Sequence, residues 1–284
     1  MRLAGLRIPL AVAVLVGLAA CTALTSNGDA PPPAAGEAPP EAKQDAGPSS
    51  RDGAPADGGT DDDAPAGPSG DILGTLASGS CGIVKTQLAQ AAPSLESNVL
   101  VFQAGEVYER AGLSPGGQAI FDAPNAGGSS IESEVMSFEV LRYCEGAALV
   151  KTETQILYAA PDGVGPNSIT DMLVSIDGKK VGVSVTRAYK PPSQPLTDVD
   201  LKDLVEKKLE GINRSSVRVL AADKWVKQIL HVFAVNKAAA DGVARVWATI
   251  DPAVRADTIV LVTQTTGGGF VYCNPDPPLG SECL

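Results

Sequence analysis

One short segment constrains the fold of this chain more than any other feature. Residues 168–189 read SITDMLVSIDGKKVGVSVTRAY, in which apolar and polar residues alternate on both sides of the DGK at 177–179. Alternation with a period of two is typical of strands, and Asp-Gly is a strong two-residue turn signal. In the second strand Val181, Val183 and Val185 share one face, while Gly182, Ser184 and Thr186 share the other. The segment therefore predicts a β-hairpin.

Helical and strand patterns alternate around this hairpin. Ser129 and Glu132 form a capping-box pattern, and Thr197 or Asp198 caps a later helix that Gly211 ends. The run WVKQILHVFAV is apolar throughout, as expected for a strand buried on both faces. In order, the expected elements are a helix over 129–146, a strand over 148–159, the hairpin, a helix over 197–212, a strand over 225–235, a helix from Asn236 to Trp247 and a strand over 257–265. This order predicts an α/β fold, with an antiparallel hairpin that leads into a parallel pair crossed by a helix.

The element order and the hairpin residues together resemble the restriction-endonuclease-like, or PD-(D/E)XK, superfamily. Its core is a helix, a three-strand meander, a helix and a further strand, and the resemblance covers residues 129–265. It implies a hydrated Mg²⁺ held by one acid at the start of the second strand and another in the third strand. A lysine two residues after the second acid helps to activate water, since residues two apart on a strand face the same side.

The resemblance transfers only part of that site to this sequence. Asp171 matches the first acid, which makes it the expected metal ligand, and Glu134 matches a supporting glutamate found in many members. Ser184 stands at the position of the second acid and Thr186 at that of the lysine. A hydroxyl is a poor Mg²⁺ ligand and does not exchange a proton near neutral pH.

The sequence therefore favours a catalytically inactive domain that needs no cofactor and serves binding or interaction at the cell surface. In the alternative, the chain is a Mg²⁺-dependent nuclease that acts on extracellular DNA. Asp171 and Glu134 then remain catalytic. Lys151 and Glu153 are the candidates for relocated residues, because they alternate onto one face of the first strand, whereas Arg187 leaves its strand by the opposite face. A third possibility is a purely structural component of the cell envelope.

The N-terminus is typical of an exported protein. Residues 1–20 combine Arg2 and Arg7 with an apolar run too short to span a bilayer comfortably. The sequence LAAC at 18–21 resembles the lipobox of bacterial lipoproteins, in which the cysteine is acylated. The resemblance implies anchoring in a lipid bilayer through Cys21, and Thr22 favours the outer membrane. An ordinary signal peptide that precedes a cysteine is the alternative.

The next segment, 21–70, is rich in Ala, Pro, Gly and Asp and contains no aromatic residue. Such a chain cannot bury enough apolar surface to offset its ordering entropy, so we expect a disordered tether. It carries nine acidic residues, and much of the net charge of −11 comes from it. Residues 71–128 are poorly patterned and form an N-terminal extension, a subdomain or part of the core. Residues 266–284 are expected to form a cysteine-containing loop.

Four cysteines remain after Cys21: Cys81, Cys144, Cys273 and Cys283. In an exported protein an even number favours two disulfides over a metal site. Three pairings are possible, and the short Pro-rich loop between the last two favours Cys273–Cys283 with Cys81–Cys144.

Other motifs are weaker. His231 is the single histidine and lies in an apolar run, so we expect a core residue with a hydrogen-bond partner. TGGGF at 266–270 lacks the lysine of a phosphate-binding loop. Residues 179–227 have an excess of basic side chains, which could bind the phosphates of a nucleic acid. Several of them pair with acidic residues at helical spacing, however, so we expect ordinary solubilising charge.

Overall fold

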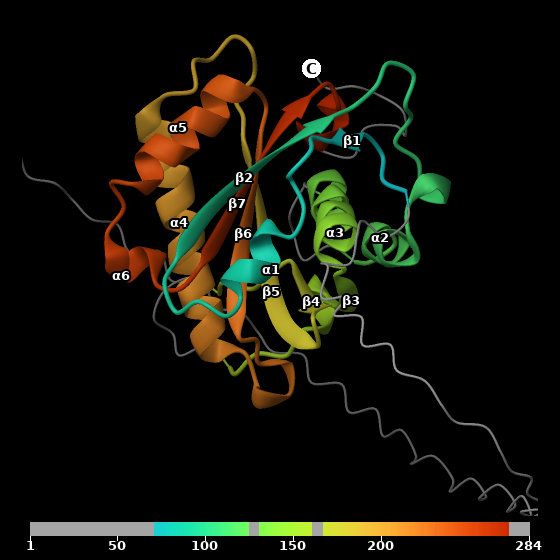
Figure 1. The fold of residues 1–284 in the computed structure, drawn as a ribbon. Coiled ribbons are helices and arrows are strands. Elements are labelled where there is room, and N and C mark those ends of the chain that lie inside the picture. The colour runs from blue at the N-terminus through green and yellow to red at the C-terminus, as the bar shows by residue number, and fades with distance from the viewer. Residues whose placement is uncertain (1–70, 125–130, 161–166, 273–284) are drawn as a thin grey trace, which may run out of the picture. The chain divides into compact units, whose positions relative to one another are not determined.

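A computed structural model describes residues 71–124, 131–160 and 167–272, all within one unit, Asp61–Leu284. They form a mixed α/β fold built on a twisted seven-stranded sheet (Figure 1). The strands are β1 (Thr75–Leu76), β2 (Ser94–Val101), β3 (Ala148–Thr152), β4 (Met172–Ile176), β5 (Lys179–Ala188), β6 (Lys227–Ala234) and β7 (Ile259–Thr266). The helices are α1 (Ile83–Gln87), α2 (Pro115–Phe121), α3 (Ile131–Glu145), α4 (Asp198–Arg218), α5 (Lys237–Trp247) and α6 (Pro252–Arg255).

The strands lie in the order β1-β2-β7-β6-β5-β4-β3. Four adjacent strands, β2, β7, β6 and β5, are parallel, and the strands on either side of them pair antiparallel. The carboxyl ends of the four parallel strands therefore meet at one edge, which we call the carboxyl edge. The α/β class and the parallel pair crossed by a helix are as expected from the sequence.

Helices cover both faces of the sheet (Figure 1). On one face α1, α2 and α3 enclose a core that includes Phe138, Val183 and Phe233. On the other face α4 and α5 enclose a second core that includes Leu209 and Leu230. Every residue of β6 is buried, since helices pack on both of its sides. This agrees with the continuous apolar run in its sequence.

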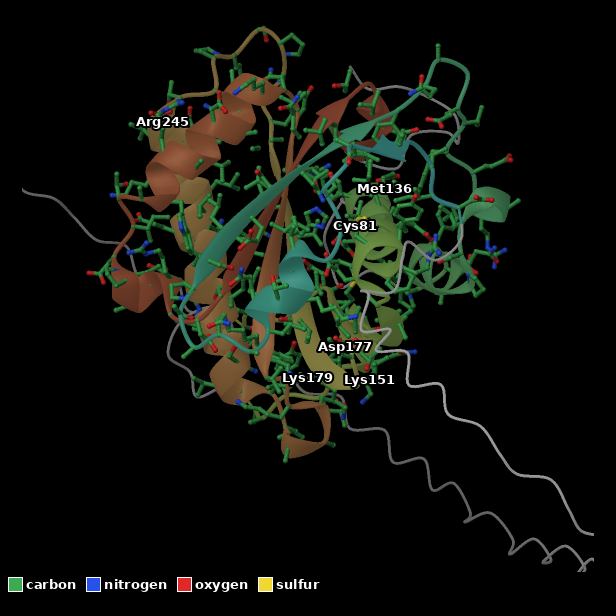
Figure 2. The ribbon with its side chains drawn as sticks, in the orientation of Figure 1. Cys81, Met136, Lys151, Asp177, Lys179 and Arg245 are labelled. Carbon is green, nitrogen blue, oxygen red and sulfur yellow. A yellow bond between two sulfur atoms is a disulfide. The ribbon has the colours of Figure 1, made fainter. Side chains whose placement is uncertain are left out.

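The predicted hairpin is formed by β4 and β5. Asp177 and Gly178 have φ angles of 49° and 70°, the pair of left-handed conformations that a tight hairpin turn requires. Asp177 also pairs with Lys85 at 2.9 Å, which links the turn to α1. Figure 2 shows Asp177 and Lys179 at the tip of this hairpin.

Two boundaries and one strand differ from the sequence prediction. The strand expected over 148–159 ends at Thr152, because the side chains of Thr152 and Gln155 form a capping box that starts a 3-10 turn. Helix α4 continues through Gly211 to Arg218 instead of ending there. The poorly patterned residues 71–128 supply β2, which pairs with β7 over its whole length.

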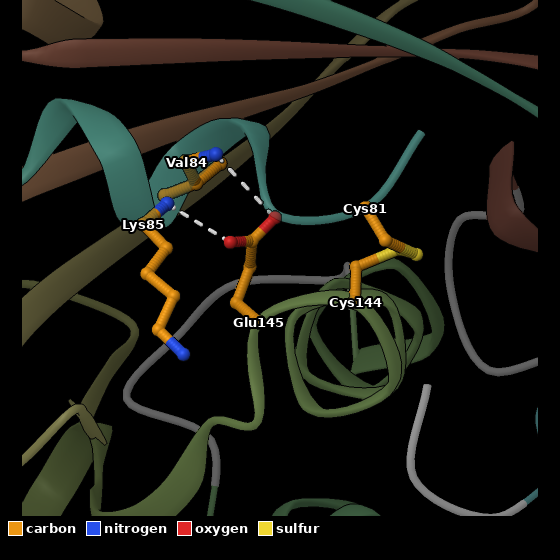
Figure 3. Close-up of a disulfide and its surroundings, with 5 residues drawn as sticks. All are labelled: Cys81, Val84, Lys85, Cys144 and Glu145. Carbon is orange, nitrogen blue, oxygen red and sulfur yellow. Dashed lines mark hydrogen bonds between the residues drawn. A yellow bond between two sulfur atoms is a disulfide. The ribbon is translucent and has the colours of Figure 1, made fainter. Parts of the chain in front are cut away.

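A disulfide joins Cys81 to Cys144, the pairing that the sequence favours (Figure 3). Beside it the carboxylate of Glu145 accepts the backbone N–H groups of Val84 and Lys85 at 3.4 and 2.9 Å. These contacts fix the short helix α1 to the end of α3, because the first N–H groups of a helix lack partners within it. Cys273 and Cys283, and Ser129 of the expected helix cap, lie outside the described residues.

Candidate functional site

The site predicted at the hairpin is built differently from a metal site. Asp171 is half-buried, and its carboxylate accepts the backbone N–H of Val185 at 2.5 Å. Lys208 of α4 donates to the backbone carbonyl of the same residue at 2.9 Å. Burial raises the pKa of Asp171, while the ammonium of Lys208 and the Val185 N–H act in the opposite direction.

Strand length explains this arrangement. The pairing of β4 with β5 begins at Met172 opposite Val183, so β5 extends beyond its neighbour. The N–H and C=O of Val185 on that side have no strand to pair with. Since a buried backbone group without a partner is costly, Asp171 and Lys208 supply the two missing partners.

Ser184 and Thr186 lie near Asp171, whereas the other residues of the predicted site lie elsewhere. Both hydroxyls are buried on the α4 side of the sheet, and continuing the pairing of Met172 with Val183 by one residue places Ser184 opposite Asp171. Glu134 is buried on α3, where it interacts with Arg187. Lys151, a candidate for a relocated residue, pairs with Asp223 at 2.8 Å.

Glu153, the second relocation candidate, lies in the 3-10 turn after β3 and not on a strand face. Among the described residues no group of three or more His, Cys, Asp or Glu side chains is arranged to hold a metal ion. The described residues around Asp171 therefore do not fit a Mg²⁺ site.

Buried charge gathers instead near the carboxyl edge. Arg187, close to the end of β5, interacts electrostatically with Glu132 and Glu134 from the first turn of α3, both of which are buried. Tyr189 and Tyr272 add to this environment, and burial lowers the pKa of the guanidinium. Ionisable side chains kept inside a fold are common at functional sites.

Polar side chains extend from this cluster into the core. The ring nitrogens of His231 lie 2.8 Å from the hydroxyl of Ser137 and 2.7 Å from that of Thr263. The hydroxyls of Thr265 and Tyr272 are 2.7 Å apart. His231 is fully buried, and burial lowers its pKa to about 3, so the ring is neutral. It is a core histidine with hydrogen-bond partners, as the sequence indicated.

A cavity of about 330 Å³ opens at the same edge, between the segment after β2 and the turn after β7. We call it the edge cavity. Phe102, Tyr108 and Phe270 form its aromatic part, and Tyr108 stacks on Phe270 with ring centroids 4.5 Å apart. Gln103, Ala104, Glu106, Val107, Thr266, Gly267 and Gly268 complete its lining.

The turn after β7 depends on its glycines. Gly267 and Gly268 have φ angles of 71° and 67°, which favour glycine. A Cβ atom at Gly268 would lie 2.2 Å from the ring of Phe102, so a side chain there would displace that ring. The TGGGF motif that the sequence analysis set aside as a phosphate loop is thus part of the cavity wall.

Tyr108 connects the edge cavity with the buried charges. Its side chain is 4% exposed, and its hydroxyl has no hydrogen-bond partner in the described part of the chain. Burial, Glu132 and Glu139 all raise the pKa of this phenol far above its usual range. No sequence pattern marked Tyr108 as a site residue, because it lies in the poorly patterned segment before α2.

Part of this chain is similar to a protein of a eukaryote. A Dictyostelium discoideum protein described as "AAC-rich mRNA clone AAC4 protein" is 40% identical over 168 residues, which cover 56% of this chain. The chain spans about a quarter of that relative, 24% of its length. No family model and no solved structure matches the chain.

This relative corrects the interpretation of the N-terminus. It comes from a eukaryote, so the identification of the chain as an acylated lipoprotein of a bacterial envelope is wrong. The predictions that depend on a bacterial envelope are therefore wrong as well. These are the outer-membrane location, the role at a bacterial cell surface, the extracellular nuclease and the structural envelope component. Cys21 and the tether lie outside the described residues. No described helix has both the length and the apolar composition to cross a bilayer.

Proposed function

We propose that this domain is a non-catalytic binding domain that takes a small molecule in the edge cavity. The observation that carries the proposal is the aromatic edge cavity at the carboxyl ends of β2 and β7, together with the buried Tyr108 of its lining, whose hydroxyl has no hydrogen-bond partner in the described residues. In α/β folds, ligands commonly bind outside the carboxyl ends of parallel strands, where loops supply the contacts.

The chemistry of the lining supports a small organic ligand. Ligand pockets are mainly apolar and aromatic, with a few polar groups that fix orientation. The edge cavity has three aromatic side chains, the carboxylate of Glu106 and the amide of Gln103. The buried hydroxyl of Tyr108 beside it is a further group that a ligand or water would satisfy.

We also propose that α3, β3, β4, β5, α4 and β6 form the restriction-endonuclease-like core that the sequence resembles. The support is the order of these elements together with the antiparallel meander β3-β4-β5 and the parallel pair β5-β6. We propose further that the domain works without a metal. The support is that the carboxylate of Asp171 already accepts the backbone N–H of Val185 and interacts with the ammonium group of Lys208.

Screening a library of small fragments by ligand-observed NMR tests the binding proposal. Ala104, an exposed residue of the cavity wall, is replaced by Trp to fill the edge cavity. The matched control is Ala238→Trp, which replaces another exposed alanine, in a separate cavity of about 360 Å³ beside the start of α5. We expect fragments that lose binding in Ala104→Trp and keep it in Ala238→Trp. Fragment binding that is unaffected by Ala104→Trp would refute the proposal.

A further inference from the structure

The edge cavity has an uneven charge. Glu106 is the only ionisable carboxylate among its described lining residues, and none of these residues is Lys, Arg or His. An anionic ligand would therefore meet a like charge with no compensating cation. This argues against a phosphate or carboxylate group in this cavity.

Glu106 is held in place by the backbone. Its two carboxylate oxygens accept the N–H groups of Gly74 at 3.3 Å and Gln103 at 2.7 Å. A carboxylate has about four lone-pair positions, so two remain for a donor from a ligand. Because the side chain is already ordered, a ligand that binds it loses little rotamer entropy at the protein side.

The other walls suit an apolar body. Phe102, Tyr108 and Phe270 are each less than 10% exposed and pack on one another, with Phe102 and Phe270 edge to face at 5.2 Å. Aromatic rings attract cations as well as apolar groups, most strongly where water is excluded. A positive group at the rim and an apolar group inside thus match the two parts of the lining.

We infer that the edge cavity takes a small organic cation, an amine on an apolar body, with its charge at Glu106 and its body against Phe102, Tyr108 and Phe270. The inference deepens the proposed function and rests on it, since it names the ligand class of the same cavity.

Three probes of similar size separate charge from shape: benzylamine, a cation at neutral pH, benzyl alcohol, which is neutral, and benzoate, an anion. Each is titrated into the full 284-residue chain at low ionic strength, and dissociation constants are measured by NMR. We expect benzylamine to bind about ten-fold more tightly than benzyl alcohol, because a hydrogen bond to a charged group is the stronger kind. We expect benzoate to bind most weakly.

Two variants locate the effect. Glu106→Gln should remove the preference for benzylamine and leave the binding of benzyl alcohol nearly unchanged. Glu109→Gln, an exposed acid outside the cavity lining, should keep the preference. Thermal midpoints of both variants show whether Glu106→Gln has disturbed the loop instead.

Each outcome is decisive. Equal binding of benzylamine and benzyl alcohol, or tighter binding of benzoate, refutes the cation inference and leaves the cavity proposal standing. A preference for benzylamine that survives in folded Glu106→Gln also refutes it. If none of the probes binds and the fragment screen finds no molecule sensitive to Ala104→Trp, the proposed function itself fails.

Discussion

The carboxylate of Asp171 accepts the backbone N–H of Val185 at 2.5 Å. Lys208 bonds the carbonyl of that same valine, so an acid and a base close the part of β5 that extends beyond β4. The acid that most resembles a catalytic residue in the sequence thus completes the sheet. Because Asp171 and Lys208 supply these contacts, the fold does not need a second acid at Ser184 or a lysine at Thr186.

Replacing Asp171 with Ala should destabilise the protein by about 1–3 kcal/mol, because it leaves the buried N–H of Val185 without an acceptor and removes the carboxylate that faces the charge of Lys208. Asp171→Asn keeps an acceptor and should cost less. Ser184→Ala, on the same strand pair, serves as the control, with an expected change below about 1 kcal/mol. Urea unfolding measures all three. If Asp171→Ala is as stable as the native chain, Asp171 does not have this structural role.

Removing the charge of Arg187 should also be costly. Arg187→Met leaves the buried carboxylates of Glu132 and Glu134 without their cation, and we expect a loss of about 2–4 kcal/mol, reduced somewhat because the guanidinium is only partly buried. Adding Glu132→Gln and Glu134→Gln should restore at least half of the lost stability. Arg245→Met breaks an exposed ion pair with Asp198 and should leave the urea midpoint nearly unchanged. Equal effects of the two arginine variants would contradict the importance of the cluster.

Stability should fall as the pH is lowered through the range in which the unfolded chain protonates His231. Its pKa is about 3 in the folded protein against an ordinary value of 6.5. Between these values the unfolded state binds a proton that the folded state does not, so acid favours unfolding by about 1.4 kcal/mol per pH unit. The contribution of the neutral His231 ring to the free energy of unfolding is fully present above pH 6.5. It decreases as the pH falls toward 3.

The difference between the native chain and His231→Gln isolates this effect. Asp171 and Glu145 have raised pKa values, which give a slope of the opposite sign, but both remain in the variant. Urea midpoints from pH 7 to pH 5 should decline in the native chain and decline less in His231→Gln. Parallel declines would show that His231 is not the group that titrates.

Much of the fold follows from local patterns. The Asp177-Gly178 turn, the cap of Asn236 on α5 and the apolar run of β6 each specify their structure within a few residues. The ends of some helices and strands depend on contacts with other segments, so local patterns did not predict them. Thr152 ends β3 through a bond to Gln155, while α4 passes through Gly211, where a Cβ atom would meet little.

The candidate site was harder to predict because it depends on contacts between distant segments. Phe102 and Phe270 are 168 positions apart and meet only because β2 and β7 are neighbours in the sheet. Residues of β2 include Glu96, Ser97 and Asn98, so its apolar signal is weak. The hairpin acid Asp171 attracted attention through a family pattern, whereas its real partners, Val185 and Lys208, have no sequence signature.

The disulfide should contribute strongly to stability. Cys81 and Cys144 are 63 positions apart, and a loop of this size corresponds to about 4 kcal/mol in the chain-entropy account. We expect Cys81→Ser with Cys144→Ser to lower the urea midpoint and to increase amide exchange at Val84 and Lys85, whose N–H groups bond to Glu145. Reductant should do the same to the native chain. An unchanged midpoint under reductant would contradict this expectation.

The most direct test of a binding site at the carboxyl edge is a chemical-shift map of the ¹⁵N-labelled full chain, titrated with the fragment that binds most tightly. The account predicts that the largest shifts occur at Gln103, Tyr108, Gly267 and Gly268, the amides around the edge cavity. Largest shifts at Asp171, Ser184 and Thr186 would contradict it and return the function to the hairpin.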